Sequence, residues 1–278
     1  MKKEKIDLYA YYNIDRNGAS GGYLTVCART ETAETRRRSR PAMLVMPGGG
    51  YGALSDREGE PVAIKFMSEG FSAFVLKYSV HRKYPVPLVE AMLAVKYIRE
   101  NADKYSVDSN HICAIGFSAG GHLTGMLGTV KQYEAEFINN SAENVRPNAV
   151  ILSYPVITMG EYTHLDTRKN ITEGDTSLYD KLSVEKRVDK SSAPVFIWHT
   201  CNDGEVGVAN SLLLAESYRK AGVPFCLHIF ENGWHGLSLA DDEVCDFIPE
   251  HYTMRDAGKW FGLSCDWLKS RDITVNIQ

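Results

Sequence analysis

The chain has 278 residues, of which 44% are hydrophobic and 24% are charged, and its formal net charge is −4. A chain of this length and composition can bury one large core, so we expect a single domain over residues 1–278. The small negative charge gives no electrostatic reason to expect a nucleic acid or an anionic membrane surface as a partner.

Segments that would direct the chain to a membrane or hold a metal are not recognisable in the sequence. The first residues alternate polar and apolar side chains and lack the continuous apolar stretch of a secretory signal. No stretch approaches the about 18 apolar residues of a membrane-spanning helix. The six cysteines are scattered without a C-x-x-C pair that would indicate zinc or a redox dithiol. We therefore expect a reduced cytoplasmic protein with mostly buried thiols.

The first predicted elements are two antiparallel strands, over residues 5–12 and 22–29. The basic run Arg36–Arg40 follows them and is expected in a solvated loop. From Pro41 onward strands alternate with helices, which predicts a mainly parallel sheet with helices on both faces. The predicted strands are short apolar runs: Ala42–Met46, Ser72–Lys77, His111–Phe117, Ala149–Tyr154, Pro194–His199 and Phe225–Phe230.

Apolar residues at three- and four-residue steps predict helical faces over Leu88–Tyr105 and Ala257–Leu268. Residues 156–190 interrupt the alternation of strands and helices with a long polar stretch. Connections of this length inside a compact domain are usually functional or mobile, so we predict a small lid or cap insertion here. A short helix is expected within it, near Leu178–Arg187.

A G-x-S-x-G pattern formed by Gly116, Ser118 and Gly120 stands between a predicted strand and a predicted helix. This is the context of a nucleophile elbow. A sharp reversal from strand into helix leaves no space for Cβ atoms at the flanking positions and holds the serine hydroxyl outward. We therefore predict Ser118 as a nucleophile.

A serine nucleophile needs a base within hydrogen-bond reach, and behind such an elbow the partners follow in the order Asp or Glu, then His. Asp203 follows the fifth strand from Pro41 onward, and His235 follows the sixth. Because the carboxyl ends of parallel strands meet at one edge of a sheet, these residues can meet Ser118 there. Glu205 is the nearest alternative acid, but Asp203 is favoured because it directly follows a tight polar turn.

Other histidines compete with His235 for the role of base. His199 and His228 lie within or at the end of strands, where packed structural roles are expected. His251 lies in a polar loop, and His122 lies on the helix after the serine, where it is expected to pack below the site.

Acyl transfer also requires hydrogen-bond donors for the tetrahedral oxyanion. The glycine run Gly48–Gly50 follows a predicted strand, and glycine lets the backbone approach a substrate closely. We assign the oxyanion hole to the backbone N–H of Gly49 or Gly50 together with that of Ala119. A plain glycine-rich turn is the alternative. A phosphate-binding loop is disfavoured because no G-K-[ST] follows.

These motifs together resemble the bacterial carboxylesterase and acetylxylan-esterase-like branch of the α/β-hydrolase superfamily, near the hormone-sensitive-lipase-like enzymes. The resemblance covers roughly residues 40–270 and is carried by PGGGY, YSVDSNHICAIGFSAGGHL, HTCNDGEV and GWHGL, in that order. It implies the α/β-hydrolase fold, with Ser118 as nucleophile, Asp203 as acid, His235 as base and Gly49 and Gly50 in the oxyanion hole. Many relatives have histidine where this chain has Pro47, so the subfamily is left open.

The resemblance further implies activity on short acyl esters, often of acetylated sugars. We predict a serine esterase for short-chain carboxylic esters, with acetylated sugars and xylo-oligosaccharides as candidate substrates, working through an acyl-enzyme without metal or organic cofactor. Tyr51, Tyr162 and Trp234 offer aromatic surfaces for a sugar, although each is equally suited to packing. Two alternative functions are left open, a small prolyl-oligopeptidase-like peptidase and a non-catalytic binding protein on the same fold. The expected partner is a small-molecule ester, and a homodimer is also left open.

Overall fold

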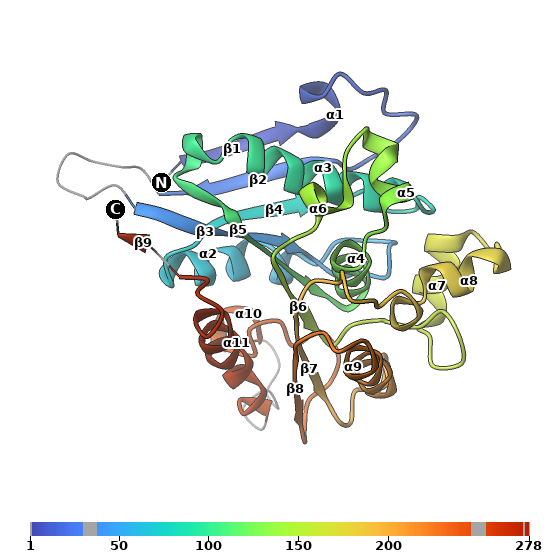
Figure 1. Ribbon diagram of the computed structural model, residues 1–278. Coiled ribbons are helices and arrows are strands. Elements are labelled where there is room, and N and C mark those ends of the chain that lie inside the picture. The colour runs from blue at the N-terminus through green and yellow to red at the C-terminus, as the bar shows by residue number, and fades with distance from the viewer. Residues whose placement is uncertain (1, 30–37, 246–253, 275, 278) are drawn as a thin grey trace.

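The computed structural model describes residues 2–29, 38–245, 254–274 and 276–277, and a central sheet runs through it (Figure 1). Its strands are β1 (Lys2–Asp7), β2 (Tyr23–Ala28), β3 (Arg38–Met46), β4 (Ser72–Lys77), β5 (Val107–Phe117), β6 (Ala149–Ser153), β7 (Val195–Thr200), β8 (Phe225–Phe230) and β9 (Asn276–Ile277). The order is β1-β2-β4-β3-β5-β6-β7-β8, and β9 pairs with the start of β3. Strands β3 to β8 run parallel, whereas β1 and β2 are antiparallel, as predicted.

Helices cover both faces of this sheet, which confirms the predicted layer arrangement (Figure 1). They are α1 (Leu8–Tyr11), α2 (Glu60–Ser68), α3 (Val86–Glu100), α4 (Ser118–Gly128), α5 (Gln132–Ala135), α6 (Ala142–Val145), α7 (Leu165–Thr172), α8 (Tyr179–Leu182), α9 (Ala209–Ala221), α10 (Asp242–Cys245) and α11 (Trp260–Lys269). The core on one face includes side chains of α3, α4 and α9, and the core on the other includes side chains of α2 and α11. In the described part of the chain, no helix is long and apolar enough to cross a bilayer.

Two predicted elements near the N-terminus differ from the structure. Residues 8–11 form α1 instead of continuing the first strand, because the Asp7 carboxylate accepts a hydrogen bond from the N–H of Ala10 and caps a helical turn. The basic run is not a solvated loop from Arg38 onward, since Arg38–Arg40 belongs to β3 and the Arg40 guanidinium donates to the carbonyl of Gly70. Arg36 and Arg37 lie outside the described residues.

Both predicted helical faces are found, each divided between an α-helix and a 3₁₀ turn. The first is α3 followed by the turn Asp103–Tyr105, and the second is the turn Ala257–Lys259 followed by α11.

The polar segment 156–190 contains more helix than the sequence indicated. Only four residues, those of α8, are α-helical near the predicted position, between two 3₁₀ turns. The unpredicted helix α7 is capped by His164, whose ring Nδ1 accepts the N–H of Thr167. Asn170 on α7 donates its side-chain amide to the carbonyl of Gly50, 2.9 Å away. The segment therefore packs directly against the loop that follows β3.

The reversal from β5 into α4 depends on glycines at its two flanks. A Cβ atom at Gly116 would lie 2.1 Å from both the carbonyl oxygen of Gly120 and Oγ1 of Thr124, and one at Gly120 would lie 2.2 Å from the carbonyl oxygen of Met46. These distances are too short for any non-bonded contact, so a larger residue requires the backbone to move.

We predict that Gly120→Ala destabilises the protein by about 3 kcal/mol or more, because the added methyl group meets backbone atoms that cannot move aside. Gly262→Ala is the matched control, since Gly262 lies on α11 with no atom within 4 Å of the added Cβ. The control should gain up to about 1 kcal/mol from its higher helix propensity. Urea unfolding measures both changes, and equal stability of the Gly120→Ala variant and the wild type would show that the reversal has room for a side chain.

Candidate active site

Three loops at the carboxyl edge of the sheet bring the predicted residues together. Ser118 follows β5, Asp203 follows β7 and His235 follows β8. The Nε2 atom of His235 lies 2.8 Å from Oγ of Ser118, and its Nδ1 atom lies 2.7 Å from Oδ2 of Asp203. A single imidazole therefore bridges the hydroxyl and the carboxylate, which is the geometry that proton transfer from a serine requires.

Ser118 stands at the sharpest point of the β5–α4 reversal. Its φ angle is 52°, a left-handed conformation that is uncommon for a residue with a side chain. The side chain is 7% exposed and lines a cavity with His235 and the glycines of the loop after β3. The hydroxyl is therefore held where a substrate in that cavity can reach it.

Both carboxylate oxygens of Asp203 have partners. Oδ1 accepts the N–H groups of Glu205 and Val206, each at 2.9 Å, and Oδ2 faces His235, with Nε2 of His199 3.5 Å away. Burial alone would raise the pKa of Asp203, but its interactions with His199 and His235 outweigh burial and hold this pKa well below its usual range. Glu205 takes part through its backbone N–H, and its exposed side chain does not replace Asp203 beside the imidazole.

The competing histidines have other partners, as far as the structure describes them. The ring of His199 is fully buried between Oγ of Ser211 and the carbonyl of Val206. His228 is half-buried on β8, and His251 lies outside the described residues. Among the described histidines, His235 is the one hydrogen-bonded to the predicted nucleophile.

His122 and Tyr51 form a buried pair below the site. Nδ1 of His122 lies 2.8 Å from the Tyr51 hydroxyl, and burial lowers the pKa of His122 to about 4. Tyr51 is 0% exposed and does not line the cavity at Ser118, so its contact with a substrate stays a prediction that the burial of this residue does not favour. Trp234 packs against the core beside α11, and neither it nor the exposed Tyr162 lines the cavity at Ser118.

The loop after β3 presents the predicted oxyanion glycines to the same cavity. The N–H of Gly48 is engaged by Oε2 of Glu58 at 2.7 Å. Gly49 and Gly50 have φ angles of 127° and 63° and both line the cavity. Ala119 lies in the first turn of α4, where backbone N–H groups have no partner within the helix. Gly49 and Gly50 therefore lie at the cavity and Ala119 directly follows Ser118, and the role of their N–H groups as oxyanion donors stays a prediction.

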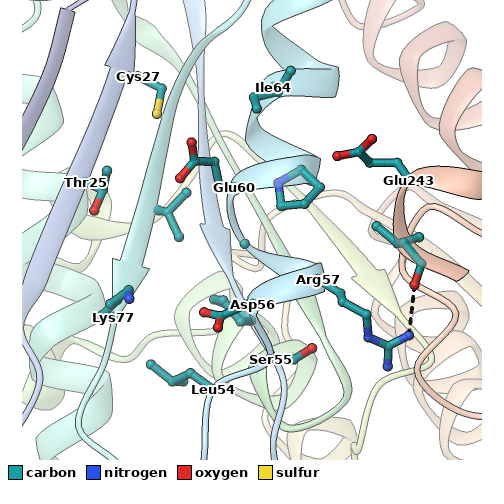
Figure 2. Close-up of a pocket in the computed structure, with 15 residues that line it drawn as sticks. Thr25, Cys27, Leu54, Ser55, Asp56, Arg57, Glu60, Ile64, Lys77 and Glu243 are labelled. Carbon is teal, nitrogen blue, oxygen red and sulfur yellow. Dashed lines mark hydrogen bonds between the residues drawn. The ribbon is translucent and has the colours of Figure 1, made fainter. Parts of the chain in front are cut away.

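The cavity at Ser118 has a volume of about 460 Å³ and a polar wall. Its charged and hydrogen-bonding lining side chains, apart from Ser118 and His235, are Ser55, Arg57, Glu58, His164, Asp166, Asn170 and Glu205. A second cavity, of about 480 Å³, lies between the sheet and α2 (Figure 2). Ser55 and Arg57 line both cavities, and Arg57 reaches across to the carbonyl of Val244. The second cavity holds none of the three predicted catalytic residues.

Two residues at the site were not found from the sequence. Glu58 is a buried carboxylate in the cavity wall, and it accepts a hydrogen bond from the Tyr154 hydroxyl at 2.6 Å. The Tyr154 ring lies edge-on to the ring of His235, with 5.0 Å between centroids. Glu58 lies in a polar loop and Tyr154 at the end of an apolar strand, so no local pattern marks either residue.

The family model named BD-FAE matches residues 31–218. Endo-1,4-beta-xylanase B of Butyrivibrio fibrisolvens is 41% identical in an alignment of 218 residues, and the match covers 73% of this chain and 33% of that protein. An acetylxylan esterase of Xylanibacter ruminicola is 29% identical in an alignment of 228 residues, and the match covers 79% of this chain and 45% of that protein. The chain thus spans less than half the length of these two curated relatives.

A solved structure is similar over nearly the full length of both chains. It is an acetyl ester-xyloside bifunctional hydrolase from Caldicellulosiruptor lactoaceticus, 33% identical to this chain, with a TM-score of 0.81. The comparison covers 98% of this chain and 97% of that one.

We predict that Asp203→Asn lowers kcat for p-nitrophenyl acetate by about 10⁴-fold, because an amide favours the wrong tautomer of the histidine. Glu205→Gln should lower kcat far less, since the carboxylate hydrogen-bonded to His235 is that of Asp203. Steady-state kinetics of the two variants compares them directly. A larger loss in Glu205→Gln than in Asp203→Asn would reverse the assignment of the acid.

Proposed function

The chain belongs to the BD-FAE family and has the α/β-hydrolase fold, and from this premise we propose that it is a serine esterase that hydrolyses short-chain carboxylic esters. The proposal includes acetylated sugars and xylo-oligosaccharides as substrates. The observation that supports it most strongly is the bridge that His235 makes between Ser118 and Asp203, at 2.8 and 2.7 Å. A buried serine held by an imidazole in this way is activated as a nucleophile, which is the role that attack on an ester carbonyl requires.

The reaction follows from this geometry. His235 takes the Ser118 proton as the hydroxyl oxygen bonds to the ester carbonyl carbon, and Asp203 holds the imidazole and stabilises its charged form. His235 then protonates the leaving alcohol oxygen as the ester bond breaks, which leaves an acyl group on Ser118. A water molecule loses a proton to His235 and attacks the acyl carbon, and the acid is released with the serine reprotonated. Main-chain N–H groups of Gly49 or Gly50 and of Ala119 donate hydrogen bonds to the oxyanion in both steps.

The substrate class rests on the cavity wall and on the relatives. A volume of about 460 Å³ suits a small molecule, and its polar lining offers partners for hydroxyl groups. The similar solved structure is named an acetyl ester-xyloside hydrolase, and one curated relative is named an acetylxylan esterase. The wall contributed by 156–190 supplies His164, Asp166 and Asn170, so the segment takes part in substrate selection in this proposal.

Two other functions use the same scaffold. A small peptidase would cleave peptide amides at least as well as esters, and a non-catalytic binding protein would not react with a fluorophosphonate. A homodimer and a cytoplasmic location stay predictions from the sequence.

We predict that Ser118→Ala reduces p-nitrophenyl acetate hydrolysis by about 10⁴-fold or more while the protein stays folded, because the acyl acceptor is removed. Ser217→Ala is the control and should retain full activity, since Ser217 is half-buried on α9 and does not line the cavity at Ser118. Fluorophosphonate labelling followed by peptide mass analysis should find the label on Ser118. Unchanged turnover in Ser118→Ala would reject the esterase proposal.

We predict that Asp166→Ala raises KM for an acetylated xylo-oligosaccharide by about tenfold, since it removes a charged hydrogen-bond acceptor for a sugar hydroxyl. KM for p-nitrophenyl acetate should stay near the wild-type value, because that substrate has no hydroxyl groups. Steady-state kinetics of the wild type and Asp166→Ala on both esters measures the two KM values. An equal change in both KM values would show that Asp166 does not recognise the sugar.

A series of esters from acetyl to decanoyl tests the preference for short acyl chains separately. Faster hydrolysis of decanoyl than of acetyl esters would count against short-chain esters as substrates.

A further inference from the structure

A buried carboxylate with no part in the proposed proton transfers connects two loops of the site. Glu58 ends the 3₁₀ turn Asp56–Glu58 and is 3% exposed. Its Oε2 atom accepts the backbone N–H of Gly48 at 2.7 Å, and its Oε1 atom accepts the hydroxyl of Tyr154 at 2.6 Å. Each oxygen is therefore committed to a different segment of the chain.

The bond to Gly48 holds the loop that carries the oxyanion glycines. A Cβ atom at Gly48 would lie 2.8 Å from Oε2 of Glu58, so the loop backbone lies directly against the carboxylate. With its own N–H turned toward Glu58, Gly48 leaves Gly49 and Gly50 to face the cavity. Loss of this bond would leave a buried N–H without a partner and free the loop to move.

The bond to Tyr154 reaches the loop that carries His235. The Tyr154 hydroxyl donates to Glu58 and accepts the backbone N–H of Ser238 at 2.9 Å. Ser238 lies three residues after His235, and the Tyr154 ring packs edge-on against the imidazole. The same tyrosine therefore contacts both the ring of the base and the backbone that follows it.

The chemistry of these contacts requires a carboxylate. Burial raises the pKa of Glu58 above its usual value, and the hydrogen bonds from Tyr154 and Gly48 and the charges of His235 and Arg57 offset only part of that rise. Both hydrogen-bonding neighbours are donors, so the ionised form satisfies both of them. A glutamine has one acceptor oxygen and would leave one of the two donors unmatched.

We propose that Glu58 is a positioning residue for this site, because one carboxylate fixes both the loop of the oxyanion donors and the tyrosine that supports His235. The inference rests on the esterase function proposed above. It assigns to Glu58 no contact with the reacting atoms.

The test compares Glu58→Gln with Glu90→Gln, since Glu90 is a buried glutamate of the same kind outside the site. Oε2 of Glu90 accepts the N–H of Ser79 at 2.6 Å, and its Oε1 accepts the Tyr9 hydroxyl at 3.1 Å. Both substitutions should lower the melting temperature. With p-nitrophenyl acetate, Glu58→Gln should lower kcat by about tenfold or more with little change in KM, because misplacement of donors and base acts on the transition state.

Inhibition by phenylboronic acid, which forms a tetrahedral adduct with an activated serine, gives a second measure. Its inhibition constant should rise in Glu58→Gln by a factor similar to the loss in kcat and stay unchanged in Glu90→Gln. If Glu58→Gln lowers the melting temperature as Glu90→Gln does but keeps wild-type kcat and inhibition, Glu58 is structural and the inference fails. Failure of the esterase proposal is distinct, because the wild type itself would then lack activity that depends on Ser118.

Tyr154→Phe keeps the test decisive if Glu58→Gln does not fold, since it removes only the hydroxyl. It should lower kcat several-fold without changing KM. In a folded double variant, Tyr154→Phe should add less to the effect of Glu58→Gln than it has alone, because the two act through one bond. The proposed connection between Glu58 and His235 would be rejected if Tyr154→Phe kept the wild-type kcat. It would also be rejected if the losses in kcat of Tyr154→Phe and Glu58→Gln were additive in the double variant.

Discussion

The imidazole of His235 is the bridge on which the candidate site depends, because it joins a hydroxyl and a carboxylate that come from separate strands. This bridge exists because parallel strands end at one edge, so β5, β7 and β8 deliver their following loops to the same place. The loops after β7 and β8 are also tied to each other. Gly233 donates its N–H to Oδ1 of Asn202 and accepts the hydroxyl of Thr200 at 2.7 Å, which fixes His235 relative to Asp203.

The proposed oxyanion donors and the polar cavity wall lie at the same edge of the sheet. The loop after β3 brings glycine N–H groups to the cavity, and α7 packs on that loop through the bond from Asn170 to Gly50. In our proposal Glu58 connects this side of the site to the side that carries His235. The donors for the oxyanion, the proton acceptor and the polar wall would then form one mechanically coupled unit, in which a change at Glu58 affects the reaction without contact with the substrate.

The parallel sheet, the elbow and the meeting of Ser118, Asp203 and His235 could be predicted because each rests on a local pattern combined with the rule that strand ends converge. The resemblance to acetylxylan-esterase-like enzymes is likewise supported by the comparisons. Helix α1 was missed because the capping bond of Asp7 overrides an alternating pattern, and the helical content of 156–190 was underestimated because α7 is mostly polar. The burial of Tyr51 and the position of Glu58 could not be predicted, because both result from contacts with residues far apart in sequence. Such contacts leave no periodic pattern in the sequence.

A serine esterase of this kind carries an acyl group on Ser118 during turnover. Rapid acid quenching of the wild-type protein during p-nitrophenyl acetate hydrolysis, followed by peptide mass spectrometry, tests this directly. We expect an acetyl group on the peptide that contains Ser118, appearing before the steady state and disappearing when the ester is exhausted. Turnover that proceeds with no acetylated peptide, or with the acetyl group on another residue, would contradict it.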